Sequence, residues 1–326
     1  MALFRGPGRL CALLGGALLP LDFLPRAPGF SFVRAGADCD RGRLRLSPGG
    51  SRAGYPCARA VRSEKPIRLI DISSPLKAGI ASDPPDMLPE IQYLDHRMTA
   101  PRMANYMGVG IDAFPDGNYA GVERCTISTH NGTHVDALWH YFPTSNHALK
   151  PGGEPAPRID ELSLEWFFQP AVKLDFRHFE DGYVATPGDL EAELGRIGHR
   201  LQPLEIVVVN TAAGARYGEE DYIHRGSGVG RAGTLWLLEQ GVRVVGTDGW
   251  SWDAPFSHTR RKVAATGDYG LIWEEHRAGR EIGYSQIEKL YNLEALPSEG
   301  FRIACFPVKE HRGSAGRTRA VAILPD

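Results

Sequence analysis

The chain has 326 residues, of which 42% are hydrophobic and 23% charged, a usual composition for a globular protein of one large domain or two small ones. Its 37 basic and 39 acidic residues give a formal net charge of −2, so no charge excess favours binding to nucleic acid or to an anionic membrane. No C-x-x-C pair occurs among the five cysteines, so neither a zinc knuckle nor a disulfide framework is indicated; they are Cys11, Cys39, Cys57, Cys125 and Cys305.

The segment from residue 1 to about residue 63 differs in composition from the rest of the chain. It is rich in Arg, Gly, Pro and Ala, has few acidic residues and shows no sustained helical or strand period. Its apolar run, Leu10 to Leu21, is too short and too interrupted to span a bilayer. A secretory signal, an organellar transit peptide and a disordered extension all stay open. We predict an extension over residues 1–63, a folded domain over 64–326, and a cytoplasmic protein unless the extension is a targeting peptide.

The first part of the folded domain is predicted to contain strands joined by irregular chain. Residues Ile67 to Ile72 alternate in polarity and end in Ser-Ser-Pro, which indicates a strand running into a loop. The Pro- and Asp-rich segment Ser82 to Pro89 is predicted to be irregular. The β-rich run Cys125 to His130 predicts a second strand, after which Gly132 lets the backbone turn and a helical turn is predicted to begin at His134.

The second part of the domain alternates helices with strands. Thr186 as N-cap, Pro187 at the first helical position and an acid in the first turn predict a helix through about Arg196. The unbroken β-branched run Ile206 to Thr211 predicts a buried strand. Further elements are predicted as a helix ended by Gly241 and three strands: Ala232–Gln240, then Val242–Thr247, Ile303–Val308 and Ala320–Leu324. The fold class is therefore α/β, a single mixed β/α domain.

One short stretch concentrates residues that bind metals. The sequence STHNGTHVDALWHY, Ser128 to Tyr141, holds three of the chain's eleven histidines and an aspartate. If the chain turns at Gly132, the side chains of His130, His134 and Asp136 can converge on one point. Two neutral imidazoles and a carboxylate suit Zn²⁺ or Mn²⁺, and three protein ligands leave a coordination position for water. A metal lowers the pKa of such a water from ~15.7 to roughly 7, which makes hydroxide available at neutral pH.

His140 lies four residues after Asp136 and would share its face on a helix. It is therefore a candidate for a fourth ligand or for an acid/base group beside the metal. The alternative for the whole cluster is a polar loop whose histidines hydrogen-bond with each other and with the backbone.

The residues from His130 to His140, HNGTHVDALWH, resemble the H-x-G-T-H-x-D-x-P-x-H signature of the metal-dependent cyclase family, which includes bacterial kynurenine formamidases and isatin hydrolases. Three further segments are similar to family segments, so the resemblance spans roughly residues 67–325: Ile70–Leu76 (IDISSPL), Gly246–Asp253 (GTDGWSWD) and His276–Leu296. The resemblance implies a domain of the cyclase/kynurenine formamidase type, swivelling β/β/α-like, with an irregular N-terminal extension.

The resemblance also implies roles for single residues. The implied metal ligands, for one or two divalent ions, are His130, His134, Asp136, His276 and Glu288. With two ions, Asp136 and Glu288 would be the bridging carboxylates, and His140 matches the family's proton-transferring histidine. The family's proline before this histidine is Leu138 here. Because proline fixes φ and removes a donor, the substitution puts the orientation of His140 in question more than the metal ligands.

From these observations we predict a divalent-metal-dependent hydrolase, arylformamidase-like or cyclic amidase-like. Metal-activated water would attack the carbonyl of a small amide, formamide or cyclic amide. The alternatives are a lactone or ester hydrolase with the same site, and a non-catalytic protein that keeps a structural metal. We expect a small-molecule substrate and no nucleic-acid or membrane partner. The family resemblance implies a homo-oligomer, either a dimer or a tetramer.

Other sequence features carry less information about function. The run Gly226 to Gly230 lacks the glycine spacing and the lysine of a phosphate-binding loop. Cys305 lies in an apolar run, where a cysteine is usually inert packing. Trp250, Trp252 and Phe256 follow a predicted strand and could form either core or a substrate-facing aromatic wall.

Overall fold

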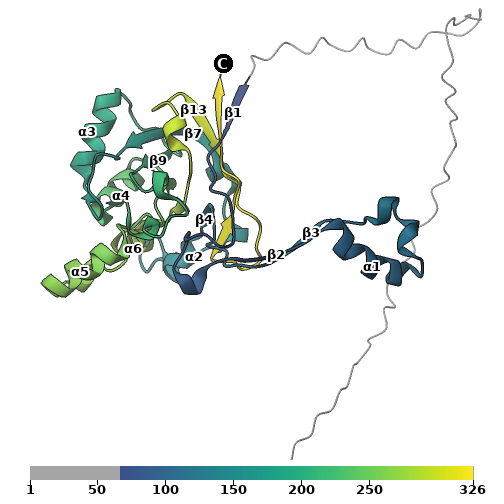
Figure 1. Ribbon diagram of the computed structural model, residues 1–326. Coiled ribbons are helices and arrows are strands. Elements are labelled where there is room, and N and C mark those ends of the chain that lie inside the picture. The colour runs from purple at the N-terminus through teal and green to yellow at the C-terminus, as the bar shows by residue number, and fades with distance from the viewer. Residues whose placement is uncertain (1–66, 326) are drawn as a thin grey trace, which may run out of the picture. The chain divides into compact units, whose positions relative to one another are not determined.

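The computed structural model describes residues 67–325 of the chain (Figure 1). The interpretations of residues 1–63, the boundary predicted after them, and the cysteines at positions 11, 39 and 57 lie outside these residues. Within residues 67–325, no helix has the length and the apolar character needed to cross a membrane.

A nine-stranded mixed sheet organises the described residues, in the order β1-β15-β13-β7-β9-β11-β12-β4-β14. Its four central strands run parallel: β7 (Phe168–Asp175), β9 (Ile206–Asn210), β11 (Val244–Thr247) and β12 (Ser285–Glu288). Antiparallel strands extend it at both sides: β1 (Ile67–Asp71), β15 (Val321–Pro325) and β13 (Phe301–Ala304) beyond β7, and β4 (His134–Asp136) and β14 (Ala315–Arg317) beyond β12.

Both faces of the parallel region are buried, and β9 shows why its sequence is apolar throughout. Ile206 and Val208 belong to one hydrophobic cluster, while Val207 and Val209 belong to a second cluster on the opposite face. Successive side chains of a strand point to opposite faces, so a strand covered on both sides needs an unbroken apolar run. The predicted buried strand is confirmed.

The second cluster lies under three helices, which Figure 1 shows together on one side of the central strands: α3 (Pro187–Ile197), α4 (Arg231–Glu239) and α6 (Glu274–Glu281). The start of α3 is fixed by a capping box, because Thr186 Oγ1 accepts from the backbone of Asp189 and Asp189 accepts from the backbone of Thr186. The predicted helix at this position is confirmed. The turn after α4 reaches Gly241 at φ 93°, a conformation that favours glycine.

The remaining strands pair outside the nine-stranded sheet. An antiparallel pair, β2 (Glu90–Leu94) and β3 (Val122–Thr126), is joined through α1 (His96–Met107), as Figure 1 shows. Two further helices are α2 (Leu138–Tyr141) and α5 (Phe256–Thr266). Two short strand pairs are also present: β5 (Thr144–Ser145) with β6 (Glu154–Pro155), and β8 (Val184–Ala185) with β10 (Gly228–Val229).

Two local predictions around the histidine motif are wrong. The strand predicted to run to His130 ends at Thr126, the last residue of β3 that pairs with β2. His134 begins a strand and not a helical turn, because β4 lies between β12 and β14 and its backbone pairs with both. The predicted strand Ile303–Val308 is also shorter than expected and ends at Ala304. Pro307 follows shortly after, and proline cannot donate to a strand ladder.

Candidate active site

Strands β4 and β12 bring a histidine and two carboxylates together. His134 and Asp136 are two residues apart on β4, so both point to the same face of the sheet. Glu288, the last residue of β12, pairs with His134 across the strands. His134 Nε2 lies 3.3 Å from Asp136 Oδ1 and 3.5 Å from Glu288 Oε2. All three residues are buried, so few waters can screen their interactions.

His130 approaches the same point from the loop before β4. The chain turns at Gly132, whose φ of 67° confirms the predicted turn. The Nδ1 atom of His130 lies 3.2 Å from His134 Nε2 and 3.0 Å from Asp136 Oδ1. The convergence predicted for these three side chains is therefore present, although His134 and Asp136 converge through strand geometry and not through a helical turn.

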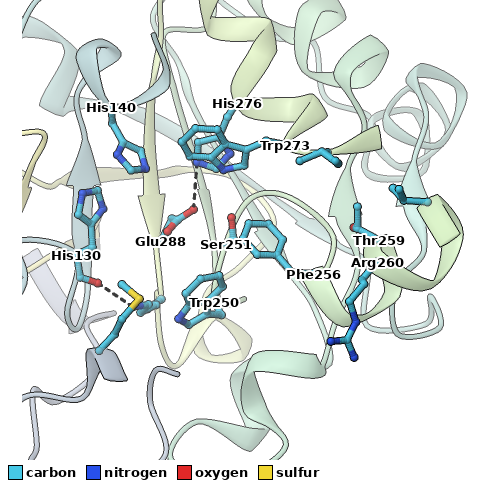
Figure 2. Close-up of a pocket in the computed structure, with 14 residues that line it drawn as sticks. His130, His140, Trp250, Ser251, Phe256, Thr259, Arg260, Trp273, His276 and Glu288 are labelled. Carbon is cyan, nitrogen blue, oxygen red and sulfur yellow. Dashed lines mark hydrogen bonds and ion pairs between the residues drawn. The ribbon is translucent and has the colours of Figure 1, made fainter. Parts of the chain in front are cut away.

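His276, on α6, completes the cluster from the other side (Figure 2). Its Nε2 atom lies 4.0 Å from Asp136 Oδ2 and 4.0 Å from Glu288 Oε1. The Nδ1 atom hydrogen-bonds the carboxylate of Asp253, in the loop that follows β11. A carboxylate that accepts from one ring nitrogen leaves the other nitrogen with its lone pair toward the cluster, the usual arrangement of a metal-ligating histidine.

The other two imidazoles are oriented in the same manner. His134 Nδ1 donates to the carbonyl of Gly132 at 2.9 Å, and a carbonyl can only accept, so the neutral ring of His134, the form that binds a metal, has its lone pair on Nε2. His130 Nε2 lies 3.0 Å from Ser314 Oγ, which leaves Nδ1 facing Asp136. Three ring nitrogens thus face two carboxylates.

The donor set fits a divalent cation. Both carboxylate oxygens of Asp136 are buried, and although His130 Nδ1 lies 3.0 Å from Oδ1, neither oxygen accepts a well-oriented hydrogen bond within residues 67–325. Such an arrangement is costly unless a positive charge lies beside the carboxylate. Burial alone would lower the pKa of His134, but the neighbouring Asp136 and Glu288 raise it to about 9. The cluster therefore attracts positive charge. Two overlapping groups of ligand atoms lie within 4.8 Å of one another: His130, His134 and Asp136, and Asp136, His140 and His276.

His140 lies on α2 against this cluster. The centroid of its ring is 4.2 Å from that of His130 and 5.6 Å from that of His276. Burial lowers the pKa of His140 to about 4; Asp136 opposes this shift, and the nearby histidines add to it. Leu138, which stands where the family has proline, is 2% exposed and belongs to the core. Core packing of Leu138 thus holds α2 in place. The proline that the family has at this position would instead restrict the backbone through its fixed φ.

The cluster forms one wall of a cavity of about 520 Å³. His130, His140, His276 and Glu288 face it, and most of the remaining lining is apolar (Figure 2): Met87, Trp250, Phe256, Val263, Ile272 and Trp273. Helix α5 contributes Phe256, Thr259, Arg260 and Val263, which are spaced as one face of a helix. The cluster is thus open to a ligand that has an apolar part.

The aromatic wall was predicted in part. Trp250 and Phe256 line the cavity and contact each other edge to face, with ring centroids 5.4 Å apart. Trp252 lies instead in the core, where its indole N–H donates to Thr234 Oγ1 at 3.0 Å. The backbone N–H of Trp252 donates to Glu288 Oε1 at 3.1 Å, and this hydrogen bond helps to orient the Glu288 carboxylate.

Sequence reasoning missed two residues beside the cluster. Trp273 stacks on His276 with ring centroids 4.5 Å apart, from a backbone with φ 58° that no sequence pattern indicates for a tryptophan. Asp253 ends the GTDGWSWD segment, and its acidic position after a strand is the signal that could have identified it. Cys305 is buried in the core, and burial raises the pKa of its thiol, which agrees with a packing role.

The fold and the cluster define a mixed α/β domain with a candidate metal centre at the end of its parallel strands. Residues 70–254, more than half of the chain, match the model of the cyclase family, described as "Putative cyclase". The chain belongs to this family, which confirms the resemblance seen in the sequence motifs.

Solved structures share the fold. An isatin hydrolase bound to the product analogue thioisatinate is 19% identical, with a TM-score of 0.61 over 80% of this chain and 93% of that one. Isatin hydrolase A from Ralstonia solanacearum is 22% identical, with a TM-score of 0.59 over 79% and 92%. A structure titled as a potential metal-dependent hydrolase with cyclase activity is 17% identical, with a TM-score of 0.54 over 80% and 100%. The predicted fold class is confirmed.

Proposed function

We propose that this protein is a divalent-metal-dependent hydrolase that cleaves the C–N bond of a small amide, formamide or cyclic amide. The observation that carries the proposal is the buried carboxylate of Asp136, which forms no well-oriented hydrogen bond within residues 67–325 and faces three imidazoles beside an open cavity. The shared fold with isatin hydrolases supports an amide as substrate.

In this proposal His130, His134 and Asp136 hold one ion, and His276 and Glu288 complete the site for a second, with Zn²⁺ and Mn²⁺ both suited to the donor set. A bound divalent ion polarises the substrate carbonyl and lowers the pKa of water, so that hydroxide is available near neutral pH. Asp253 fixes the ring of His276 by accepting from Nδ1, so the ligand atom is already oriented.

His140 transfers the proton. Its ring lines the cavity and is neutral at neutral pH, because burial lowers its pKa to about 4. It accepts a proton from the attacking water as the new C–O bond forms, and it returns that proton to the nitrogen as the C–N bond breaks. The products are a carboxylic acid and an amine, which remain in one molecule when the amide is cyclic.

The cavity indicates what kind of amide fits. Aromatic and aliphatic side chains form most of its walls, and burial of apolar substrate surface against them provides binding free energy. An amide attached to an aromatic or other apolar group is therefore favoured over a small polar one. This preference agrees with an arylformamidase-like or cyclic amidase-like activity.

Two alternatives use the same residues. A lactone or ester hydrolase would need the same ion and proton transfer, so only substrate tests separate it from an amidase. A purely structural metal is disfavoured by the cavity, because structural sites are normally closed by protein ligands on all sides.

The test combines metal analysis with a hydrolysis screen. The purified protein should contain metal by elemental analysis, and Zn²⁺ or Mn²⁺ should restore activity on formamides or cyclic amides after chelation. Circular dichroism should show that the chelated protein stays folded, since a structural metal would couple removal to unfolding. Asp136→Asn should lose both metal and activity. Asp71→Asn, a change to an exposed carboxylate paired with Arg319, should lose neither. Unchanged metal content in Asp136→Asn would contradict the proposed site.

A further inference from the structure

A buried ion pair lies directly beside the candidate metal centre. Lys289 follows Glu288 in the sequence, and its ammonium donates to Asp83 Oδ1 and, at 2.7 Å, to the carbonyl of His130. Lys289 is 1% exposed and Asp83 4% exposed, so neither charge is solvated. We propose that Asp83 and Lys289 are positioning residues that hold His130 and the end of β12 in the geometry that a metal ion requires. This inference rests on the proposed function.

Asp83 is the centre of the arrangement. Its Oδ2 atom accepts from Ser82 Oγ and from Asn131 Nδ2, both at 3.0 Å. Its Oδ1 atom accepts from the indole of Trp250 at 3.1 Å in addition to the ammonium of Lys289. One carboxylate thus joins the loop of the histidine motif, the segment after β12 and an aromatic wall of the cavity.

Lys289 contacts the histidine loop at a second point. Its carbonyl accepts from the hydroxyl of Thr133 at 2.6 Å, and Thr133 directly precedes His134. Its own N–H donates to Gly249 at 3.0 Å, while its φ of 58° places it in the left-handed region. A lysine rarely adopts this conformation, so the surrounding contacts must enforce it.

Stability alone is a weak reason for such a pair. Removing two charges from water is costly, and replacing a buried ion pair by neutral groups of similar volume is often neutral or stabilising. The hydrogen bonds of this pair go to the carbonyl of a candidate ligand and to a residue of the cavity wall. Its contacts therefore fix the parts of the site whose positions decide ion binding.

The test removes both charges together. Single changes leave an unpaired buried charge and can unfold the protein, so the decisive variant is Asp83→Asn combined with Lys289→Met. Affinity for Zn²⁺ and Mn²⁺ is measured by competition with a chromophoric chelator, and the absorption bands of the Co²⁺-loaded protein report coordination geometry. The double variant should stay folded, bind metal 10- to 100-fold more weakly, as is typical when groups that orient ligands are lost, and show shifted Co²⁺ bands.

The matched control is Lys173→Met. Lys173 is also a buried lysine that donates to a backbone carbonyl, that of Leu293 at 3.2 Å, but it does not line the cavity. The control should keep the wild-type metal affinity and Co²⁺ spectrum. An equal loss of affinity in the control would assign the effect to general destabilisation and overturn the inference.

The outcomes separate the two proposals. Wild-type protein that binds no metal contradicts the proposed function itself. Wild-type protein that binds metal, with a double variant of the same affinity and spectrum, contradicts only the positioning role. A double variant that cannot fold also overturns the inference, because the pair would then be required for the fold and not for the geometry of the site.

Discussion

Replacing His140 by alanine tests the proposed proton transfer most directly. The imidazole of His140 contacts the rings of His130 and Trp273, with centroids 4.2 and 5.3 Å away. His130, His134 and Asp136 form a ligand group without it. The substitution should therefore leave the metal content and the fold unchanged.

Burial keeps His140 in its neutral, proton-accepting form, and the expected loss is the usual contribution of general acid–base catalysis. With a pKa of about 4, His140 has roughly 1,000 neutral rings for each protonated ring at pH 7, so nearly every molecule carries the base. General acid–base catalysis contributes about 10²- to 10⁴-fold to a rate, which is roughly 3–5 kcal/mol of activation free energy. We expect kcat of His140→Ala to fall by that factor, with a smaller change in KM.

The assay measures turnover and metal stoichiometry on the same preparation. His311→Ala is the control, because the side chain of His311 is 87% exposed, pairs with Asp160 and does not line the cavity. If metal is lost in step with activity, His140 is a ligand, as its grouping with Asp136 and His276 would allow, and the proton-transfer role is refuted. If activity survives without His140, another group is the base.

Three further predictions follow. Burial raises the pKa of the Asp248 carboxyl from 3.8 to about 7, although Thr211 donates to it. The folded state therefore binds this proton more tightly than the unfolded state, which stabilises the fold by on the order of 4 kcal/mol below about pH 4. This contribution is lost as the pH rises from 4 to 7. Asp248→Asn should remove that slope in denaturant unfolding between pH 4 and pH 8, and an unchanged slope would contradict the assignment. A chain starting at Lys65 should keep its activity and melting temperature, because the nine-stranded sheet and the cluster lie within residues 67–325; loss of soluble protein would count against this. The homo-oligomer implied by the family resemblance should give a dimer or tetramer mass in light scattering, and a monomer mass would refute it.

The local part of the site could be predicted from the sequence because its residues are near neighbours along the chain. Histidine and carboxylate spacing around Gly132 indicated convergence, and convergence occurs. The turn at Gly132 on which this prediction rested is present, but the strand before it ends at Thr126, and His134 and Asp136 lie on a strand where a helical turn was expected. Residues two apart share a face of a strand, so β4 brings the side chains of His134 and Asp136 together in place of the expected helical turn.

The distant part of the site could not be derived from spacing. His276 and Glu288 lie far along the chain, and only the family resemblance connected them with the histidine motif. Their position depends on β12 pairing with β4, an antiparallel contact at the side of a parallel sheet that no local pattern specifies. Asp83 was assigned to irregular chain for the same reason: its partners lie in loops that the fold alone brings together.

The structure also separates the residues that would bind the ion from those that would select the substrate. The neighbouring strands β4 and β12 carry His134, Asp136 and Glu288. Trp250, Phe256 and most of the apolar wall come instead from chain between the histidine motif and β12. Loops and inserted helices tolerate sequence change far better than paired strands do. Wall residues that do not contact the ligands, such as Val263, can therefore vary while the ligands keep their positions, and similarity in the metal motif alone does not identify the substrate of this protein.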